Sequence, residues 1–174
     1  MNMERIFLVG YMGSGKSTIG RYLAHDMGWK FIDMDHYFEE KHQCTIGQYF
    51  EKFGEDGFRE AERAVVEELC SVEKAVDATG GGAPCFFDNM EKMVKAGATI
   101  YISVEPEILA TRLRMAKANR PLIAQKTDDE LLAYIKEKLS EREPFYRKAK
   151  LIVDGERLPF STYKLLIENM PFDE

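Results

Sequence analysis

Residues 6–17 read IFLVGYMGSGKS, an apolar run followed by a glycine-rich loop that ends in lysine and serine. The loop, Gly10 to Ser17, matches the pattern G-x-x-x-x-G-K-[ST] at every fixed position. The apolar run has the composition of a buried parallel strand, and residues 16–27 follow with helical spacing until Gly28. A strand, a glycine loop and a helix in this order indicate a phosphate-binding loop for a nucleoside triphosphate.

The residue types of this loop fit the chemistry of a bound triphosphate. Glycine lets the backbone turn so that its N–H groups point at the phosphates, and the N-terminus of the following helix adds partial positive charge. Lys16 is expected to reach the β- and γ-phosphates, and the Ser17 hydroxyl to bind Mg²⁺. The alternative, a glycine turn without a ligand, does not explain a complete pattern in its correct context. The predicted ATP-binding residues of the loop are Gly13, Ser14, Gly15, Lys16, Ser17 and Thr18.

Beyond the loop, short apolar runs alternate with stretches of helical periodicity. The expected strands are residues 6–9, 31–32, 74–78, 99–104 and 151–153. The expected helices are residues 16–27, 36–41, 46–53, 60–69, 89–95, 128–146 and 159–170, with one more that begins at Pro106. This alternation predicts an α/β fold of the P-loop NTPase type, with three layers and a five-stranded parallel sheet. Ligands of such sheets bind beyond the carboxyl ends of the strands.

Length and composition narrow the class of protein. A chain of 174 residues, 45% hydrophobic and 31% charged, is predicted to form one domain over residues 1–174. The net charge of −6 argues against nucleic acid or an anionic membrane as a partner, and no apolar run approaches the length of a membrane span. Three cysteines without metal-like spacing, and no signal peptide, favour free thiols in the cytoplasm. A chain of this size favours a small-molecule kinase over a motor or signalling NTPase.

Two carboxylates, Asp33 and Asp35, follow the second expected strand. In an extended segment these positions lie on the same face, so both side chains are expected to point at the phosphate edge of the sheet. Phosphoryl transfer needs one carboxylate near Mg²⁺ and another that orients or deprotonates the attacking hydroxyl. An acidic pair here would equally cap a helix that starts near His36. The residues alone leave both interpretations open.

Three consecutive glycines, residues 80–82, follow the third expected strand. They cost backbone entropy on folding and contribute no side chain to the core. Their position at the carboxyl end of a strand therefore favours a place where the backbone approaches a ligand closely.

These motifs together resemble those of the shikimate kinase family over almost the whole chain. The shared segments are GYMGSGKST (10–18), DMD (33–35), IGQYFEKFGEDGFREAE (46–62), TGGGA (79–83), RPL (120–122) and EREPFY (141–146). The phosphate loop alone is common to many families, whereas these segments in this order are specific. The resemblance implies a fold like that of the nucleoside monophosphate kinases. It also implies ATP-dependent phosphorylation of the 3-hydroxyl of shikimate, with Mg²⁺, in the biosynthesis of chorismate and the aromatic amino acids.

The resemblance further implies roles for the candidate site residues. Asp33 resembles the carboxylate that holds Mg²⁺ together with Ser17, and Asp35 resembles the residue that binds the shikimate hydroxyls and serves as catalytic base. Two arginines resemble the pair that binds the substrate carboxylate, and two glycines resemble those whose backbone approaches the substrate ring. The implied substrate-binding residues are Asp35, Arg59, Gly81, Gly82 and Arg142.

Two regions complete the implied site. Residues 34–61 correspond to a substrate-binding helical region. Glu62 follows this region, and its carboxylate is expected to orient Arg59, three residues earlier. Residues 114–127 correspond to a lid that closes over the phosphates. Its Arg120 resembles the arginine that stabilises charge on the transferring group, so the predicted catalytic residues are Lys16, Asp35 and Arg120.

The resemblance is weakest at the adenine end of the nucleotide site. Arg114, before the lid, is a candidate for stacking on adenine, and Arg157, after the last strand, is a candidate for covering it. Asp77, late in the third strand, is either an outer ligand of Mg²⁺ or simply a polar residue.

We expect a monomer. The sequence leaves two alternatives to a shikimate kinase. Another small kinase of the same fold, acting on gluconate or a nucleoside monophosphate, would share the phosphate loop. The paired arginines and the triple glycine favour a ring that carries a carboxylate. A non-catalytic nucleotide-binding protein would not need Lys16, Asp35 and Arg120 together.

Overall fold

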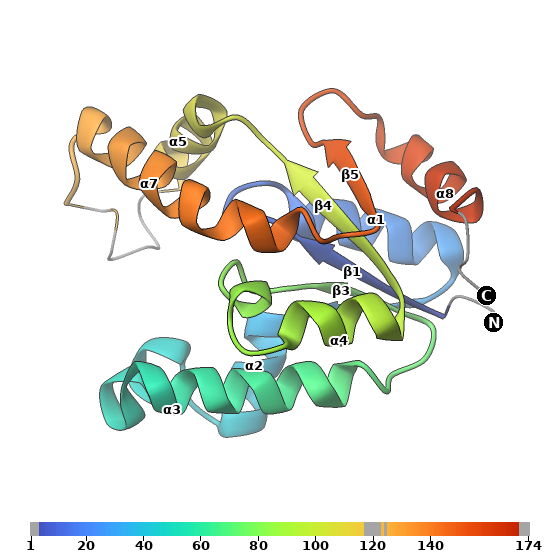
Figure 1. Ribbon diagram of the computed structural model, residues 1–174, viewed down its shortest axis with the longest axis horizontal. Coiled ribbons are helices and arrows are strands. Elements are labelled where there is room, and N and C mark those ends of the chain that lie inside the picture. Colours follow the sequence, from blue (N-terminus) through green and yellow to red (C-terminus); the bar gives the residue numbers. More distant parts are fainter. Residues whose placement is uncertain (1–3, 117–122, 124, 171–174) are drawn as a thin grey trace.

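Five parallel strands form the centre of the computed structural model, which describes residues 4–116, 123 and 125–170 (Figure 1). The strands lie in the order β2-β3-β1-β4-β5. Their bounds are β1 Arg5–Val9, β2 Lys30–Asp33, β3 Ala75–Ala78, β4 Ala98–Ser103 and β5 Leu151–Asp154. Every neighbouring pair in the sheet is parallel, so the prediction of a five-stranded parallel sheet is confirmed.

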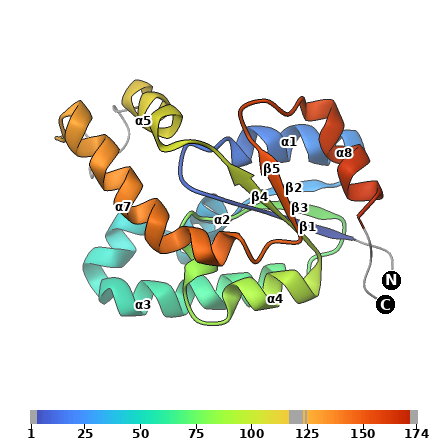
Figure 2. The same ribbon diagram turned by 45° about the horizontal axis from the view of Figure 1, so that its top comes forward.

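Helices cover both faces of this sheet. They are α1 Lys16–Met27, α2 Met34–His42, α3 Ile46–Leu69, α4 Asn89–Ala96, α5 Pro106–Met115, α7 Asp128–Tyr146 and α8 Phe160–Glu168, with a short 3-10 helix η1 at Ala83–Cys85. α1 and α8 lie on one face, and α3 and α4 lie on the opposite face (Figures 1 and 2). α5 and α7 pack against each other toward the carboxyl ends of the strands. This is the predicted three-layer α/β fold.

The hydrophobic core lies on both faces of the central strands. Residues 6–9 of β1 are 0% exposed, in keeping with their uniformly apolar composition. The largest fully buried side chains include Tyr11, Tyr101, Tyr146 and Tyr163. Within the described part of the chain, no helix has both the length and the apolar character needed to cross a membrane.

The helix boundaries follow local signals, with one difference from prediction. α1 ends at Gly28, which takes the left-handed conformation with φ 67°. α3 begins with a capping box, in which Thr45 and Gln48 each accept a backbone N–H of the other. The separate helices expected at residues 46–53 and 60–69 form one element with a kink at Gly54, whose φ of 69° and ψ of −178° are not helical. Glycine tolerates this backbone, so the helix resumes directly after it.

The expectation that Asp33 and Asp35 share one face of an extended strand is wrong. β2 ends at Asp33 and α2 begins at Met34, so Asp35 lies in the first turn of a helix. The reason is the carboxylate of Asp33, which accepts hydrogen bonds from the backbone N–H groups of Asp35 and His36 and thereby starts the helix.

Candidate active site

A cavity of about 540 Å³ opens at the carboxyl ends of β1, β2 and β3. The phosphate loop, the start of α2, the helix α3, the glycines after β3 and the helix α7 all contribute to its wall. The lining residues are Met12, Gly13, Gly15, Lys16, Ser17, Thr18, Asp33, Asp35, Ile46, Phe50, Phe58, Arg59, Glu62, Ala78, Thr79, Gly80, Gly81, Gly82 and Arg142. Segments far apart in the sequence thus meet at the edge where ligands of parallel sheets bind.

The backbone of the phosphate loop has a conformation that depends on glycine. Gly13 and Gly15 have φ values of 80° and 98°, a region that side-chain-bearing residues rarely adopt. A Cβ on Gly13 would also lie 3.2 Å from a methyl group of Leu113 on α5. The N–H of Ser14 donates to the carbonyl of Tyr11 at 3.2 Å, which closes the turn. The loop and the first turn of α1 both line the cavity, and a glycine loop that leads into a helix N-terminus is the arrangement that binds phosphate.

The cation of Lys16 is held over this loop. Its side chain is 8% exposed, and its Nζ donates to the carbonyl oxygens of Gly10 at 2.7 Å and Tyr11 at 2.9 Å. Next to it, the hydroxyl of Ser17 donates to Oδ2 of Asp33 at 2.9 Å. A cation, a hydroxyl and a carboxylate therefore meet at one end of the cavity.

Asp33 uses its two oxygens for two tasks. Oδ1 accepts from the N–H groups of Asp35 at 3.1 Å and His36 at 3.3 Å, while Oδ2 faces Ser17. The capping and the metal-binding interpretations of this residue are therefore compatible. Asp35 is exposed to the cavity from the first turn of α2, and a Cβ on Gly80 would lie 2.8 Å from its Oδ1. The glycine leaves room for this carboxylate.

Two arginines define the other end of the cavity. Nη1 of Arg59 donates to Oε1 of Glu62 at 2.7 Å, and their side chains are only 13% and 5% exposed. Burial raises the pKa of Glu62, while the charge of Arg59 opposes that rise. Arg142 comes from α7, and its guanidinium lies 5.6 Å from the centre of the Tyr11 ring. Guanidinium groups in this setting suit a carboxylate, which they bind with paired hydrogen bonds.

The glycines after β3 bring backbone close to both guanidinium groups. A Cβ on Gly82 would lie 2.8 Å from Nη1 of Arg59, and a Cβ on Gly81 would lie 3.4 Å from Nη1 of Arg142. The hydroxyl of Tyr146 donates to the carbonyl oxygen of Gly81 at 2.5 Å and fixes that part of the loop. Space therefore favours glycine at Gly82, where a Cβ would press on the guanidinium, whereas a Cβ on Gly81 would make an ordinary contact. In the phosphate loop, backbone angles favour glycine as well.

Comparison with known proteins decides the family. A family model described as "Shikimate kinase" matches residues 12–166. A shikimate kinase of Phocaeicola vulgatus is 51% identical over 156 residues, which cover 90% of this chain and 89% of that protein. The chain belongs to the shikimate kinase family.

Solved structures agree with this assignment. The crystal structure of a shikimate kinase from Bacteroides thetaiotaomicron superimposes with a TM-score of 0.88 at 44% identity and covers 95% of this chain and 97% of that one. A shikimate kinase from Acinetobacter baumannii, solved in complex with shikimate, gives a TM-score of 0.83 at 36% identity, with 97% and 95% covered. A gluconokinase from Sinorhizobium meliloti, at 18% identity and a TM-score of 0.59, shares the fold alone.

Most of the residues predicted for a shikimate kinase site line one cavity. From the phosphate loop these are Gly13, Gly15, Lys16, Ser17 and Thr18, and from the substrate side Asp33, Asp35, Arg59, Gly81, Gly82 and Arg142. Ser14 is buried within the loop and does not line the cavity. The expected pocket walls Phe50 and Phe58, and the expected Arg59 partner Glu62, also take part. Arg120 and half of the lid, residues 117–122 and 124, lie outside the described residues.

The residues proposed for the adenine end are separate from this cavity. Arg157 is 87% exposed in its side chain and lies, with Asp154, in another pocket at the ends of β4 and β5. Nε of Arg114 pairs with Asp128 at 2.7 Å. Asp77 is 0% exposed and does not line the cavity, which favours the merely polar interpretation over a metal ligand.

Sequence reasoning missed Arg112, which contacts the phosphate loop. Its Nη1 lies 3.2 Å from the carbonyl oxygen of Gly13 and 3.3 Å from that of Ser14, and it donates to both. The sequence held a signal for this contact. Leu109 and Leu113 lie on the buried face of α5, and Arg112, three residues after the first and one before the second, lies next to that face. Arg114 falls outside that face.

Proposed function

We propose that this shikimate kinase family member transfers the γ-phosphoryl group of ATP to the 3-hydroxyl of shikimate. The observation that carries the proposal is a single cavity with a phosphate loop at one end and a pair of arginines at the other. A donor with a triphosphate and an acceptor with a carboxylate fit the two ends, so the acceptor hydroxyl would lie between them. Positioning of this kind supplies much of the rate of phosphoryl transfer.

In the proposed acceptor site, two arginines supply positive charge and two glycines leave space for the substrate ring. Arg59 and Arg142 would bind the carboxylate, and Gly81 and Gly82 would let the ring approach the backbone. Asp35, exposed in the same cavity, would orient the acceptor hydroxyl and accept its proton. The structure of the Acinetobacter baumannii enzyme in complex with shikimate supports this acceptor.

The proposed donor site rests on the phosphate loop. Lys16 would contact the β- and γ-phosphates, because its Nζ already lies over the loop carbonyls. Ser17 and Asp33 fit Mg²⁺, since their oxygens lie 2.9 Å apart and Mg²⁺ prefers oxygen ligands. When bound, Mg²⁺ would neutralise charge on the transferring phosphates. The role of Arg120 in stabilising that charge stays a prediction.

The further expectations concern the setting of the enzyme. Activity as a monomer is part of the proposal. The net charge of −6 supports small-molecule partners rather than nucleic acid or membrane. A cytoplasmic location and a place in aromatic amino acid biosynthesis complete the proposal.

A coupled assay of ADP release tests the proposed function. Shikimate, gluconate and a nucleoside monophosphate are compared as acceptors at equal concentration, with Mg²⁺ and ATP. We expect turnover with shikimate, and about 10² to 10⁴ less of it in the Asp35→Asn variant, as for the loss of a general base. The matched control is Asp56→Asn, a change at an exposed position of α3. No turnover with shikimate, or preference for another acceptor, contradicts the proposal.

A further inference from the structure

The guanidinium of Arg59 lies against an aromatic ring that is outside the cavity wall. Its Cζ is 3.9 Å from the centre of the Phe86 ring and 5.0 Å from that of Phe58. A guanidinium within about 6 Å of a ring centre over its face is attracted to it, most strongly where water is excluded. Phe86 thus contacts the guanidinium of Arg59, a residue that lines the cavity, from outside the cavity wall.

Hydrogen bonds alone do not fix this guanidinium. Nη1 donates to Glu62, but Nε of Arg59 is buried and has no hydrogen-bond partner among the described residues. Both Nη1 and Nη2 lie within 2.9 Å of the position that a Cβ on Gly82 would take. One ion pair leaves the group free to rotate about that contact, and of the two rings against the guanidinium the nearer one, Phe86, constrains its plane more closely than Phe58 does.

The backbone directs Phe86 toward Arg59 and Phe87 away from the site. Phe86 follows η1 in an extended conformation, with φ −118° and ψ 145°. Phe87 then takes a left-handed φ of 51°, which is uncommon for a residue other than glycine. As a result Phe87 is 48% exposed, and its ring lies 5.0 Å from the guanidinium carbon of Arg63. The two adjacent rings make the same kind of contact, one at the site and one on the surface.

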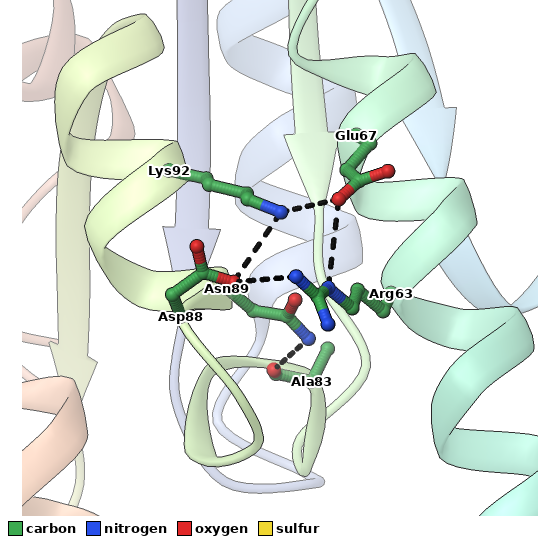
Figure 3. Close-up of polar contacts among 6 residues, drawn as sticks. All are labelled: Arg63, Glu67, Ala83, Asp88, Asn89 and Lys92. Carbon is green, nitrogen blue, oxygen red and sulfur yellow. Dashed lines mark hydrogen bonds and ion pairs between the residues drawn. The ribbon is translucent and has the colours of Figure 1, made fainter.

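A polar network holds this segment against the helix that carries Arg59 (Figure 3). The buried amide of Asn89 donates to the carbonyl of Ala83 at 2.9 Å and closes the segment from η1 to α4. Asp88 pairs with Arg63 of α3 at 3.6 Å, and Lys92 of α4 pairs with Glu67 of α3. The position of Phe86 relative to Arg59 is therefore set by contacts on both elements.

We propose that Phe86 is a positioning residue that holds the Arg59 guanidinium in the orientation needed to bind the substrate carboxylate. The inference rests on the proposed function, because it gives Arg59 the role of carboxylate ligand. Phe86 itself does not line the cavity. Its loss is expected to weaken shikimate binding and to leave nucleotide binding unchanged.

Steady-state kinetics of three variants test this inference. Phe86→Leu keeps an apolar side chain but removes the ring face, and we expect the KM for shikimate to rise about 5- to 20-fold. The kcat and the KM for ATP should stay within about twofold of the wild-type values. Phe86→Tyr keeps the ring face and should restore the KM. The matched control is Phe87→Leu, which removes the neighbouring ring from Arg63 and should leave all constants unchanged.

A double variant separates positioning from general packing. If Phe86 acts through Arg59, the Phe86→Leu change should add no further rise in KM when Arg59 is already replaced in Arg59→Gln, whose side chain carries no cation. Additive effects, or an unchanged shikimate KM in Phe86→Leu, overturn the inference while leaving the proposed function intact. If Phe86→Leu also loses ATP binding, Phe86→Met takes its place, because methionine fills the space without a ring. The inference then requires that Phe86→Met raises the KM for shikimate and leaves the KM for ATP unchanged. If the wild-type protein does not turn over shikimate, both the inference about Phe86 and the proposed function are overturned.

Discussion

The two ends of the cavity are built in different ways. The phosphate loop is one contiguous segment, and its shape depends on glycines with positive φ and on the start of α1. The carboxylate end takes Arg59 from α3, the glycines from the end of β3 and Arg142 from α7. Here neither Gly81 nor Gly82 has a positive φ, and Gly82 is favoured because the guanidinium of Arg59 comes close. One end is therefore a property of local sequence, and the other is a property of tertiary packing.

This difference predicts how each end responds to substitution. Changes in the phosphate loop should damage catalysis directly, because the backbone and Lys16 contact the group that is transferred. Changes at the carboxylate end should act mainly on the KM for shikimate, because the substrate carboxylate is remote from the reacting hydroxyl. Four substitutions test this division, in order of decreasing expected effect on activity.

Replacement of Lys16 should have the largest effect. Lys16→Ala removes a cation from the transferred phosphates, and loss of one such group is expected to lower kcat about 10²- to 10³-fold. The control Lys30→Ala removes a lysine exposed at the start of β2 and should change kcat less than about twofold. Single-turnover kinetics with saturating ATP measure the chemical step. A loss confined to the KM for shikimate would contradict the division between the two ends.

A methyl group on Gly82 should act on the opposite end. In Gly82→Ala the new Cβ would lie 2.8 Å from Nη1 of Arg59, so the guanidinium must shift. We expect the KM for shikimate to rise about 10-fold or more, since a misplaced bidentate contact costs at least about 1.4 kcal/mol. Gly47→Ala is the control, because its Cβ would meet only Thr45 at 3.8 Å. An unchanged shikimate KM in Gly82→Ala, or a change in ATP KM alone, breaks the comparison.

The same difference explains what sequence could and could not predict. The phosphate loop and the parallel sheet follow from contiguous patterns, and both are present. Arg59 and Arg142 stand out from 24 basic residues only through family resemblance, because nothing local marks them. The contact between Phe86 and Arg59 depends on how η1 packs against α3, so no sequence spacing reveals it. Of the two interpretations left open for Asp33 and Asp35, the shared strand face is wrong and the capped helix is confirmed, because capping by Asp33 overrides the strand pattern.

Tyr146 offers a smaller test of the carboxylate end. Tyr146→Phe removes the hydroxyl that donates to the carbonyl of Gly81 but keeps the ring that packs on Tyr101 at 5.2 Å. One neutral hydrogen bond contributes about 1 kcal/mol, so the KM for shikimate should rise about 3- to 10-fold. Tyr163→Phe is the control, since the buried hydroxyl of Tyr163 has no hydrogen-bond partner within residues 4–116, 123 and 125–170. Equal effects of the two variants would show that Tyr146 acts through packing alone.

Asp77 should have the smallest effect on activity, because it belongs to neither end. It lies on β3, the strand that leads into the glycine segment, yet it is 0% exposed. In the part of the chain that the structure describes, neither carboxylate oxygen has a hydrogen-bond partner. Burial raises the pKa of Asp77 to about 7, and the charge of Arg5 only partly opposes this. Asp77→Asn should therefore leave both KM values unchanged and alter stability instead.

The pH dependence of that change has a definite sign. Between the ordinary pKa of aspartate and about pH 7, the folded state keeps the proton on Asp77 while the unfolded state loses it. The wild-type protein therefore loses stability as pH rises through this range, and the loss levels off above the folded pKa. The free energy of unfolding of Asp77→Asn minus that of the wild type should rise across the range by on the order of 2–4 kcal/mol. Denaturant unfolding of both proteins from pH 4 to pH 8 measures the difference, in which other titrating groups cancel. A difference that does not change with pH would contradict the raised pKa of Asp77 in the folded protein. A rising difference with constant KM values would show that Asp77 affects stability and neither end of the cavity.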